Sequence, residues 1–167
     1  TAIDSLLDGE TQYTTNAGIF PLREEIAHYL HTRFEATYAP DSEVLVTVGA
    51  SEAIDIALRV LVRPGDEVLI PEPCYISYQA CTRFALGVPV SVPTRAENSF
   101  ELLPEDLEAR ITPQSRVLVL SYPSNPTGAV MPRERLERIA ELAIRYDLFV
   151  VCDEIYAELC YDGFRQP

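Results

Sequence analysis

Short apolar runs rich in Val, Ile and Leu alternate along the 167-residue chain with longer segments whose apolar residues recur at helical spacing. Strands that alternate with helices are joined by right-handed crossovers, so the pattern predicts an α/β fold, with a mostly parallel sheet and helices on both faces (α/β/α). Pro89 indicates that its strand lies at an edge of the sheet, because proline cannot donate to a neighbouring strand. The expected strands are residues 43–49, 66–71, 88–93, 116–121 and 148–154, and the expected helices are 22–34, 51–62, 74–86, 104–111 and 132–146.

The charge of the chain narrows the range of partners. It has 26 acidic and 13 basic residues, a formal net charge of −13, which argues against nucleic acid and anionic membranes, since both bind basic surfaces. No stretch approaches the roughly 18 apolar residues of a membrane-spanning helix. The spacings of the four cysteines fit no zinc pattern, so we expect no metal site and interpret them as reduced thiols of a cytoplasmic protein. These cysteines are Cys74, Cys81, Cys152 and Cys160.

Residues that follow the strands are the candidates for a binding site, because ligands of such sheets bind beyond the carboxyl ends of the strands. After the first expected strand, Ala50 and Ser51 open a helix, whose free amides and dipole attract anions. Ser51 can alternatively act as the helix cap, which is the simpler interpretation of this residue taken alone. The chain has neither GxGxxG nor GxxxxGK[ST], which argues against a Rossmann dinucleotide site and a Walker loop.

Two other strand ends carry residues with both a structural and a functional interpretation. Tyr75 follows the second strand, where its ring can stack on a flat ligand or simply join the core or surface. Asp153 ends the last strand, and a buried carboxylate there is costly without a partner such as a cation or a protonated ring nitrogen. Asp153 can alternatively cap a turn. Of the basic residues only Arg165 follows it, and Tyr156 can face the same site.

The fourth expected strand runs directly into SYPSNPTG, residues 121–128. Two prolines and a glycine are more than a plain turn requires, and they indicate a rigid loop. The residue that such a loop can present is Asn125.

Taken together, the segments GASEA, PEPCY, SNPTG and DEIY closely resemble the fold-type I pyridoxal-phosphate aminotransferases of the aspartate and aromatic aminotransferase class (class I/II). The SNPTG motif with DEIY about 25 residues later is the most specific part, and YTTNAGIFPLREEIA also looks like this family. The resemblance covers essentially the whole chain. It implies an enzyme that transfers an amino group between an α-amino acid and a 2-oxo acid, with pyridoxal 5′-phosphate as cofactor.

The resemblance implies a role for each candidate. Ala50 and Ser51 match the residues whose amides hold the cofactor phosphate, and Tyr75 matches the aromatic residue stacked on the ring. Asp153 matches the carboxylate paired with the ring nitrogen, which makes the protonated ring an electron sink. Tyr156 matches the tyrosine that donates to the O3′ oxygen. We therefore expect Asp153 and Tyr156 to be catalytic.

Two further residues gain a role only through the resemblance. Asn125 matches an asparagine that contacts both O3′ and the substrate carboxylate, and a cis peptide bond is implied between Asn125 and Pro126. Tyr13 matches a tyrosine that reaches the cofactor phosphate of the neighbouring subunit. This implies a homodimer with shared active sites.

The chain departs from the family pattern in what it lacks. The catalytic lysine of the family lies in a later S-x-[SA]-K motif, whereas all 13 basic residues here are arginine. We therefore expect residues 1–167 to be part of the cofactor-binding (large) domain, without the small domain and the C-terminal part of the large domain. The chain alone should be inactive. Its segment 44–49 should lack a sheet neighbour, and its strand 148–153 should expose an unpaired edge.

Two other functions remain open. A C–S lyase, a decarboxylase or an aminocyclopropane-carboxylate synthase-like enzyme shares the fold and the motifs, and the residues that distinguish these reactions lie mostly outside this chain. A lysine-free paralogue that only binds or regulates is the third possibility. A downstream lysine motif would dismiss it.

Overall fold

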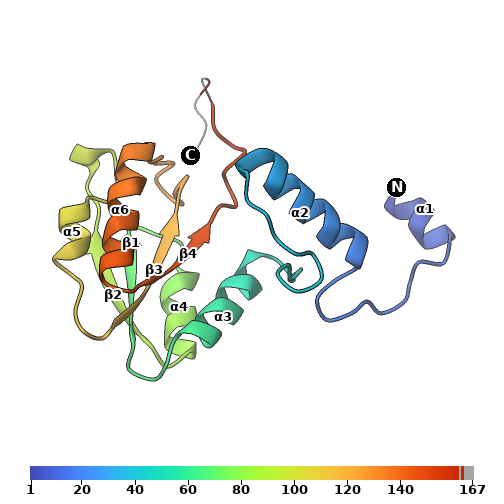
Figure 1. Ribbon diagram of the computed structural model, residues 1–167, viewed down its shortest axis with the longest axis horizontal. Helices are drawn as coiled ribbons and strands as arrows, with labels where there is room; N and C mark the ends of the chain where they lie inside the picture. Colours follow the sequence, from blue (N-terminus) through green and yellow to red (C-terminus); the bar gives the residue numbers. More distant parts are fainter. Residues whose placement is uncertain (162, 164–167) are drawn as a thin grey trace. The chain divides into compact units, whose positions relative to one another are not determined.

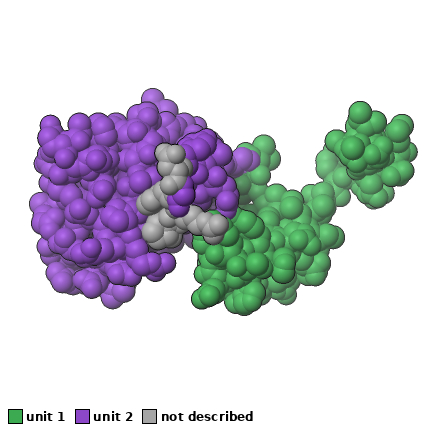
Figure 2. Space-filling view, turned by 90° about the horizontal axis from the view of Figure 1, so that it is seen from above, with its two compact units in different colours: residues 1–48 green, residues 49–167 purple. Residues whose placement is uncertain are grey.

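The structure is a computed structural model that describes residues 1–161 and 163. The chain divides into two units, residues 1–48 and residues 49–167, which have different colours in Figure 2. Each unit is described separately below. Among the described residues, no helix has the length and hydropathy needed to cross a membrane.

The first unit contains helices α1 (Ala2–Leu7) and α2 (Phe20–Phe34). The second of these confirms the helix expected over residues 22–34. Its buried Arg23 donates from Nη1 to the backbone carbonyls of Pro40, at 3.0 Å, and Asp41, at 3.2 Å. These bonds fasten the loop after α2 against the helix, because a buried guanidinium stays in place only where acceptors satisfy it.

The strand expected over residues 43–49 is wrong, since this segment is irregular and lies outside the sheet. A run of β-branched residues becomes a strand only where a neighbour pairs with it. Here the amide of Val46 donates instead to the carbonyl of Ala17, at 3.0 Å. Gly18 makes this approach possible, because a Cβ atom at position 18 would lie 2.6 Å from the Cβ of Val46.

The second unit is built on a parallel sheet with strand order β2-β1-β3-β4 (Figure 1). The four remaining expected strands are confirmed, and β2, which contains Pro89, lies at an edge as predicted. The opposite edge is β4. The strands are β1 (Glu67–Glu72), β2 (Val88–Pro93), β3 (Ser115–Ser121) and β4 (Phe149–Asp153).

Helices cover both faces of the sheet, which confirms the α/β/α prediction. The central strands are continuous apolar runs because both of their faces are buried. Val68 and Ile70 face one core, whereas Leu69 between them faces the other. The first core packs against α3 (Ala50–Leu61) and α4 (Ser77–Phe84), and the second against α5 (Pro104–Glu108) and α6 (Arg133–Arg145). A short 3-10 helix, η1 (Ala96–Asn98), follows β2.

The helix expected to begin at residue 74 begins only at Ser77. The bond between Glu72 and Pro73 is cis, and the chain turns before the helix starts. Tyr75 therefore lies in the loop between β1 and α4 and not within the helix. This places its ring beside the carboxyl ends of the strands.

Candidate functional site

A pocket of about 320 Å³ lies at the carboxyl ends of the strands of the second unit. Its walls come from segments far apart in the sequence, as the topology of a parallel sheet requires. Six residues that were predicted as site residues from the sequence line this one pocket. The lining residues are Ala50, Ser51, Tyr75, Tyr78, Asn125, Asp153, Ile155 and Tyr156.

The amino-terminal end of α3 forms one wall of the pocket. Gly49 is the N-cap of the helix, with φ +81° and ψ 167°, and it supplies no side-chain cap, whereas Ser51 is already the second residue of the helix. The alternative that Ser51 is the cap is therefore wrong. Among the described residues, the amides of Ala50 and Ser51 have no hydrogen-bond partner. Two unpartnered amides at the positive end of a helix dipole suit an anion such as a phosphate.

Tyr75 stands at the side of the pocket, half-buried. Its hydroxyl oxygen lies 3.4 Å from the Oγ of Ser51, and hydrogen bonds with Ser51 and Ser77 lower the pKa of Tyr75. The ring packs edge-on against Tyr78, with centroids 5.7 Å apart and planes at 85°. Tyr75 thus contacts Ser51 through its hydroxyl and Tyr78 through its ring. These contacts place the ring next to the unpartnered amides, where it can flank a flat ligand.

The carboxylate of Asp153 receives one hydrogen bond on each oxygen. Tyr78 donates its hydroxyl to Oδ2 at 2.7 Å, and the amide of Ile155 donates to Oδ1 at 3.2 Å. The bond from Ile155 shows that Asp153 caps a turn, as the structural alternative predicted. This cap occupies one oxygen and is compatible with a functional role of the carboxylate. Within residues 1–161 and 163, no arginine forms an ion pair with Asp153, and Arg165 lies outside the described residues. The carboxylate of Asp153 thus remains available for a cationic group of a ligand.

Backbone hydrogen bonds within the loop after β3 hold its conformation. Its Asn125–Pro126 bond is cis, which confirms the expectation from the resemblance. The amide of Gly128 donates to the carbonyl of Ser124, and the amide of Ser124 donates to the carbonyl of Ala129, both at 2.8 Å. This geometry carries the Asn125 side chain to the pocket.

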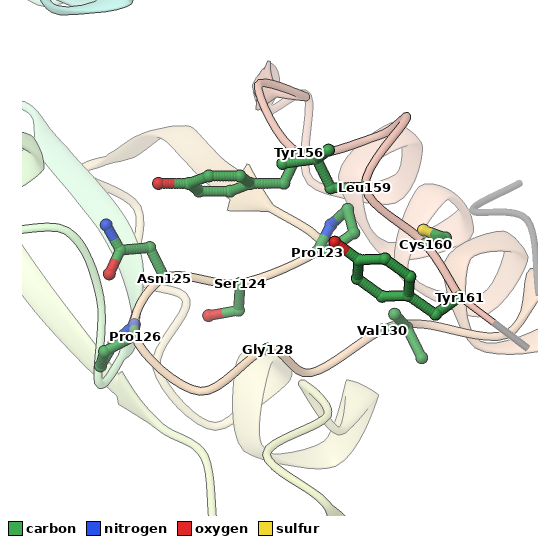
Figure 3. A pocket seen from close by; sticks show the side chains of 10 residues that line it. All are labelled: Pro123, Ser124, Asn125, Pro126, Gly128, Val130, Tyr156, Leu159, Cys160 and Tyr161. Atoms are coloured by element: carbon green, nitrogen blue, oxygen red, sulfur yellow. The ribbon is translucent and has the colours of Figure 1, made fainter.

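A larger hollow of about 590 Å³ adjoins the pocket and shares Asn125 and Tyr156 with it (Figure 3). In Figure 3 the hydroxyl of Tyr156 points to the side on which the Asn125 amide lies. None of the described residues that line this hollow is charged. Among the described lining residues, Asp153, Ala50 and Ser51 belong to the smaller pocket and not to the hollow. The smaller pocket therefore holds the groups that suit a charged ligand.

Two residues differ from the prediction: Tyr78 lines the pocket but was not predicted, and Tyr13 was predicted but does not line the pocket. Tyr78 was missed as a site residue, and its position three residues after Tyr75 was the only sequence signal that could have found it. Tyr13 belongs to the first unit, where its side chain is exposed. Its expected role concerns a neighbouring subunit and stays a prediction.

The donor set of the pocket fits pyridoxal phosphate. Unpartnered amides at a helix start suit the phosphate, an aromatic side chain can flank the ring, and a carboxylate without a cation can pair with a protonated ring nitrogen. No observation on the described residues conflicts with this ligand.

Comparisons with known proteins agree with the geometry. The family model described as Aminotransferase class I and II matches residues 3–166. The chain is 51% identical over 161 residues to the protein named "Putative aminotransferase YugH" of Bacillus subtilis, and it covers 42% of that protein's length. It is 38% identical over 164 residues to aromatic-amino-acid aminotransferase 2 of Thermococcus litoralis, also covering 42% of that protein.

Solved structures show the same relationship. The aromatic aminotransferase of Pyrococcus horikoshii superposes with a TM-score of 0.97 at 38% identity, over 99% of this chain and 44% of that one. The aspartate aminotransferase of Thermus thermophilus with maleate superposes with a TM-score of 0.94 at 40% identity, over 99% of this chain and 43% of that one. The chain thus spans less than half the length of the proteins it matches.

Proposed function

Because the chain belongs to the class I and II aminotransferase family, we propose that it is part of a longer enzyme that transfers an amino group between an α-amino acid and a 2-oxo acid. The cofactor of this enzyme is pyridoxal 5′-phosphate. One observation carries the proposal: six residues that the resemblance assigned to cofactor or substrate binding line one pocket. They come from three separate strand ends and from the start of α3.

In this proposal the chain holds the phosphate and the ring through different elements. The amides of Ala50 and Ser51 bind the phosphate, with the dipole of α3 behind them. Tyr75 would flank the ring from the side of the pocket that it lines. Its hydroxyl contact with Ser51 couples the two parts of the site.

Asp153 and Tyr156 determine the protonation of the ring in this proposal. When bound, pyridoxal phosphate supplies a ring that withdraws electrons from the α-carbon of the substrate. The carboxylate of Asp153 would favour a protonated ring nitrogen, because a nearby opposite charge stabilises the charged form of a titrating group. Tyr156 would donate its hydroxyl to O3′, and Asn125 would donate its amide to O3′ and to the substrate carboxylate.

The proton transfer itself requires a residue that this sequence does not contain. A base that moves a proton at the α-carbon in this family is a lysine, and residues 1–167 include none. We therefore propose that these residues are part of the cofactor-binding domain. The lysine, the small domain and the rest of the large domain then belong to the remainder of the full-length protein.

Further parts of the proposal concern partners and compartment. Tyr13 would reach the cofactor phosphate of a second subunit, which makes the enzyme a homodimer with shared active sites. All four cysteines are unpaired, which supports a reducing compartment such as the cytoplasm. The named relatives include aromatic and aspartate aminotransferases, so the names support the reaction but select no single amino acid.

The test uses the full-length protein, purified with pyridoxal phosphate and assayed against a panel of amino acids. We expect more than one equivalent of a 2-oxo acid per site to form only when a second 2-oxo acid is present as acceptor, because the cofactor itself can take up only one amino group. Release of CO₂ or of a thiol without an acceptor would instead identify a decarboxylase or a C–S lyase. Cofactor binding without any turnover would favour the binding module.

The isolated chain of residues 1–167 provides the matched control. With no lysine it should show no turnover, and borohydride should trap the cofactor nowhere except on the terminal amine of Thr1. A trapped adduct elsewhere in this chain, together with turnover, would contradict both the missing-lysine argument and the view that the chain is part of a longer enzyme.

A further inference from the structure

Tyr78 is the most deeply buried side chain of the pocket, with 2% of its surface exposed. Its hydroxyl connects α4 to the end of β4 through the 2.7 Å bond to Asp153, across 75 positions of sequence. A buried tyrosine keeps its hydroxyl bonded, and a carboxylate is a strong acceptor for it. This contact is therefore specific and not a by-product of packing.

The backbone around Tyr78 is fixed by contacts on both sides of the residue. Thr82, one turn later and fully buried, donates its hydroxyl to the carbonyl of Tyr78 at 2.8 Å. Gln79 donates its side-chain amide to the carboxylate of Glu72 at the end of β1. Ser91 on β2 donates to the same carboxylate at 2.6 Å. The first turn of α4 is thus tied to two strands of the sheet.

The hydroxyl of Tyr78 acts as a donor throughout the physiological pH range. Burial raises the pKa of Tyr78 far above its usual value, and the nearby charge of Asp153 raises it further, whereas Ser121 opposes the shift. The proton therefore stays on the phenol and points to Oδ2 of Asp153. The direction of the hydrogen bond follows from this, because a phenol that keeps its proton can donate it to a carboxylate oxygen.

We propose that Tyr78 is a positioning residue that holds the carboxylate of Asp153 in the orientation needed to keep a proton on the cofactor's ring nitrogen. The inference rests on the proposed function. The amide of Ile155 fixes Oδ1 and Tyr78 fixes Oδ2, so together they set the plane of the carboxylate. The terminal torsion of an aspartate is otherwise broad. The edge contact with Tyr75 lets the same ring support the tyrosine beside the cofactor.

The test compares Tyr78→Phe with Tyr122→Phe in the full-length protein. Tyr122 is the matched control, because it is also buried and donates its hydroxyl to a backbone carbonyl, that of Phe100, at 3.0 Å. Both variants lose one buried hydrogen bond and keep their rings. Only Tyr78→Phe removes a donor from Asp153.

Two readouts separate positioning from a purely structural role. The first is the affinity for 4′-deoxypyridoxine 5′-phosphate, which has no aldehyde and so cannot bond to a lysine. The second is the ¹⁵N chemical shift of the ring nitrogen of the bound, labelled analogue. We expect Tyr78→Phe to weaken binding about tenfold, as for a lost hydrogen bond to a charged group, and to move the ¹⁵N signal towards the unprotonated ring. Tyr122→Phe should change neither readout.

A double-mutant cycle keeps the proposal falsifiable if Tyr78→Phe also lowers stability. In an Asp153→Ala background, Tyr78→Phe should have no further effect on analogue affinity, since its partner is gone. Equal effects in both backgrounds, or a Tyr78→Phe variant that behaves like Tyr122→Phe, would overturn the role of Tyr78. If the unmutated protein binds neither the analogue nor pyridoxal phosphate, the proposed function fails instead.

Discussion

The Oγ atom of Ser51 and the hydroxyl oxygen of Tyr75 lie 3.4 Å apart, joining the first turn of α3 to the loop that follows β1. One contact thus links the element that presents free amides to the element that presents an aromatic ring. A ligand with an anionic group and a flat ring can bind to both without either element moving. The geometry leads to four predictions on the full-length protein.

Ala50→Pro should weaken binding of pyridoxal phosphate by about 10- to 100-fold, the cost of one hydrogen bond to a charged group. Proline removes the amide of residue 50 but is well tolerated at the first position of a helix. Affinity for pyridoxal, which has no phosphate, should stay unchanged. Arg133→Pro, at the first position of α6, is the control, because that helix start lines neither the pocket nor the adjoining hollow. Equal losses for pyridoxal and its phosphate would refute the phosphate site.

Asp153→Ala should lower turnover on the order of 10³-fold or more, because the ring nitrogen loses its ionic partner in the transition state. Asp153→Glu should lose less, since it keeps a carboxylate. The measurement is kcat at saturating cofactor, with cofactor content checked by absorbance. Glu154→Ala removes an exposed neighbouring carboxylate and should leave kcat near normal. Near-normal turnover of cofactor-loaded Asp153→Ala would rule out the electron-sink role.

Tyr13→Phe and Asp153→Ala should complement each other if Tyr13 acts across a subunit interface. A mixed dimer contains one site with both residues intact, so random exchange should recover about a quarter of normal activity. The assay follows activity after subunit exchange verified by mass spectrometry. Each variant exchanged with itself is the control. No recovery after complete exchange would argue that Tyr13 serves its own subunit or no site at all.

Two isoleucines of α6 test the assignment of the core. Ile139 is 2% exposed and packs in the core between α6 and the sheet, whereas Ile144 on the same helix is 82% exposed. Ile139→Ala should lower the free energy of unfolding by about 2–5 kcal/mol through lost burial and a cavity. Ile144→Ala should stay within about 0.5 kcal/mol. Chemical denaturation measures both, and equal effects would contradict the orientation of α6.

The local sequence pattern predicted most of the fold, because the spacing of apolar residues alone indicates the four strands and the helices that cover both faces of the sheet. It failed for residues 43–49, where the pattern favours a strand but the backbone of Val46 bonds to Ala17 instead. Strand formation depends on a partner, which a single segment does not specify. The late start of α4 is a similar case, since a tight turn before Ser77 takes residues that were assigned to the helix.

The site was predictable to the extent that motifs mark strand ends, and six residues meet in one pocket as expected. The bond between Tyr78 and Asp153 was not predictable in the same way. Their strand β4 and the strand before α4, β1, are not neighbours, since β3 lies between them. Whether the two side chains meet depends on the register of β1 against β3 and of β3 against β4. It also depends on the residue at which α4 begins.

The strand order β2-β1-β3-β4 has a consequence for how the chain can fold while it is being made. Translation delivers β1 first, and each later strand pairs with one that has already left the ribosome: β2 with β1, β3 with β1, and β4 with β3. At about 5–20 residues per second, synthesis is slow enough for local structure to form between these deliveries. A nascent chain can therefore extend this sheet outward without separating any pair of strands already formed.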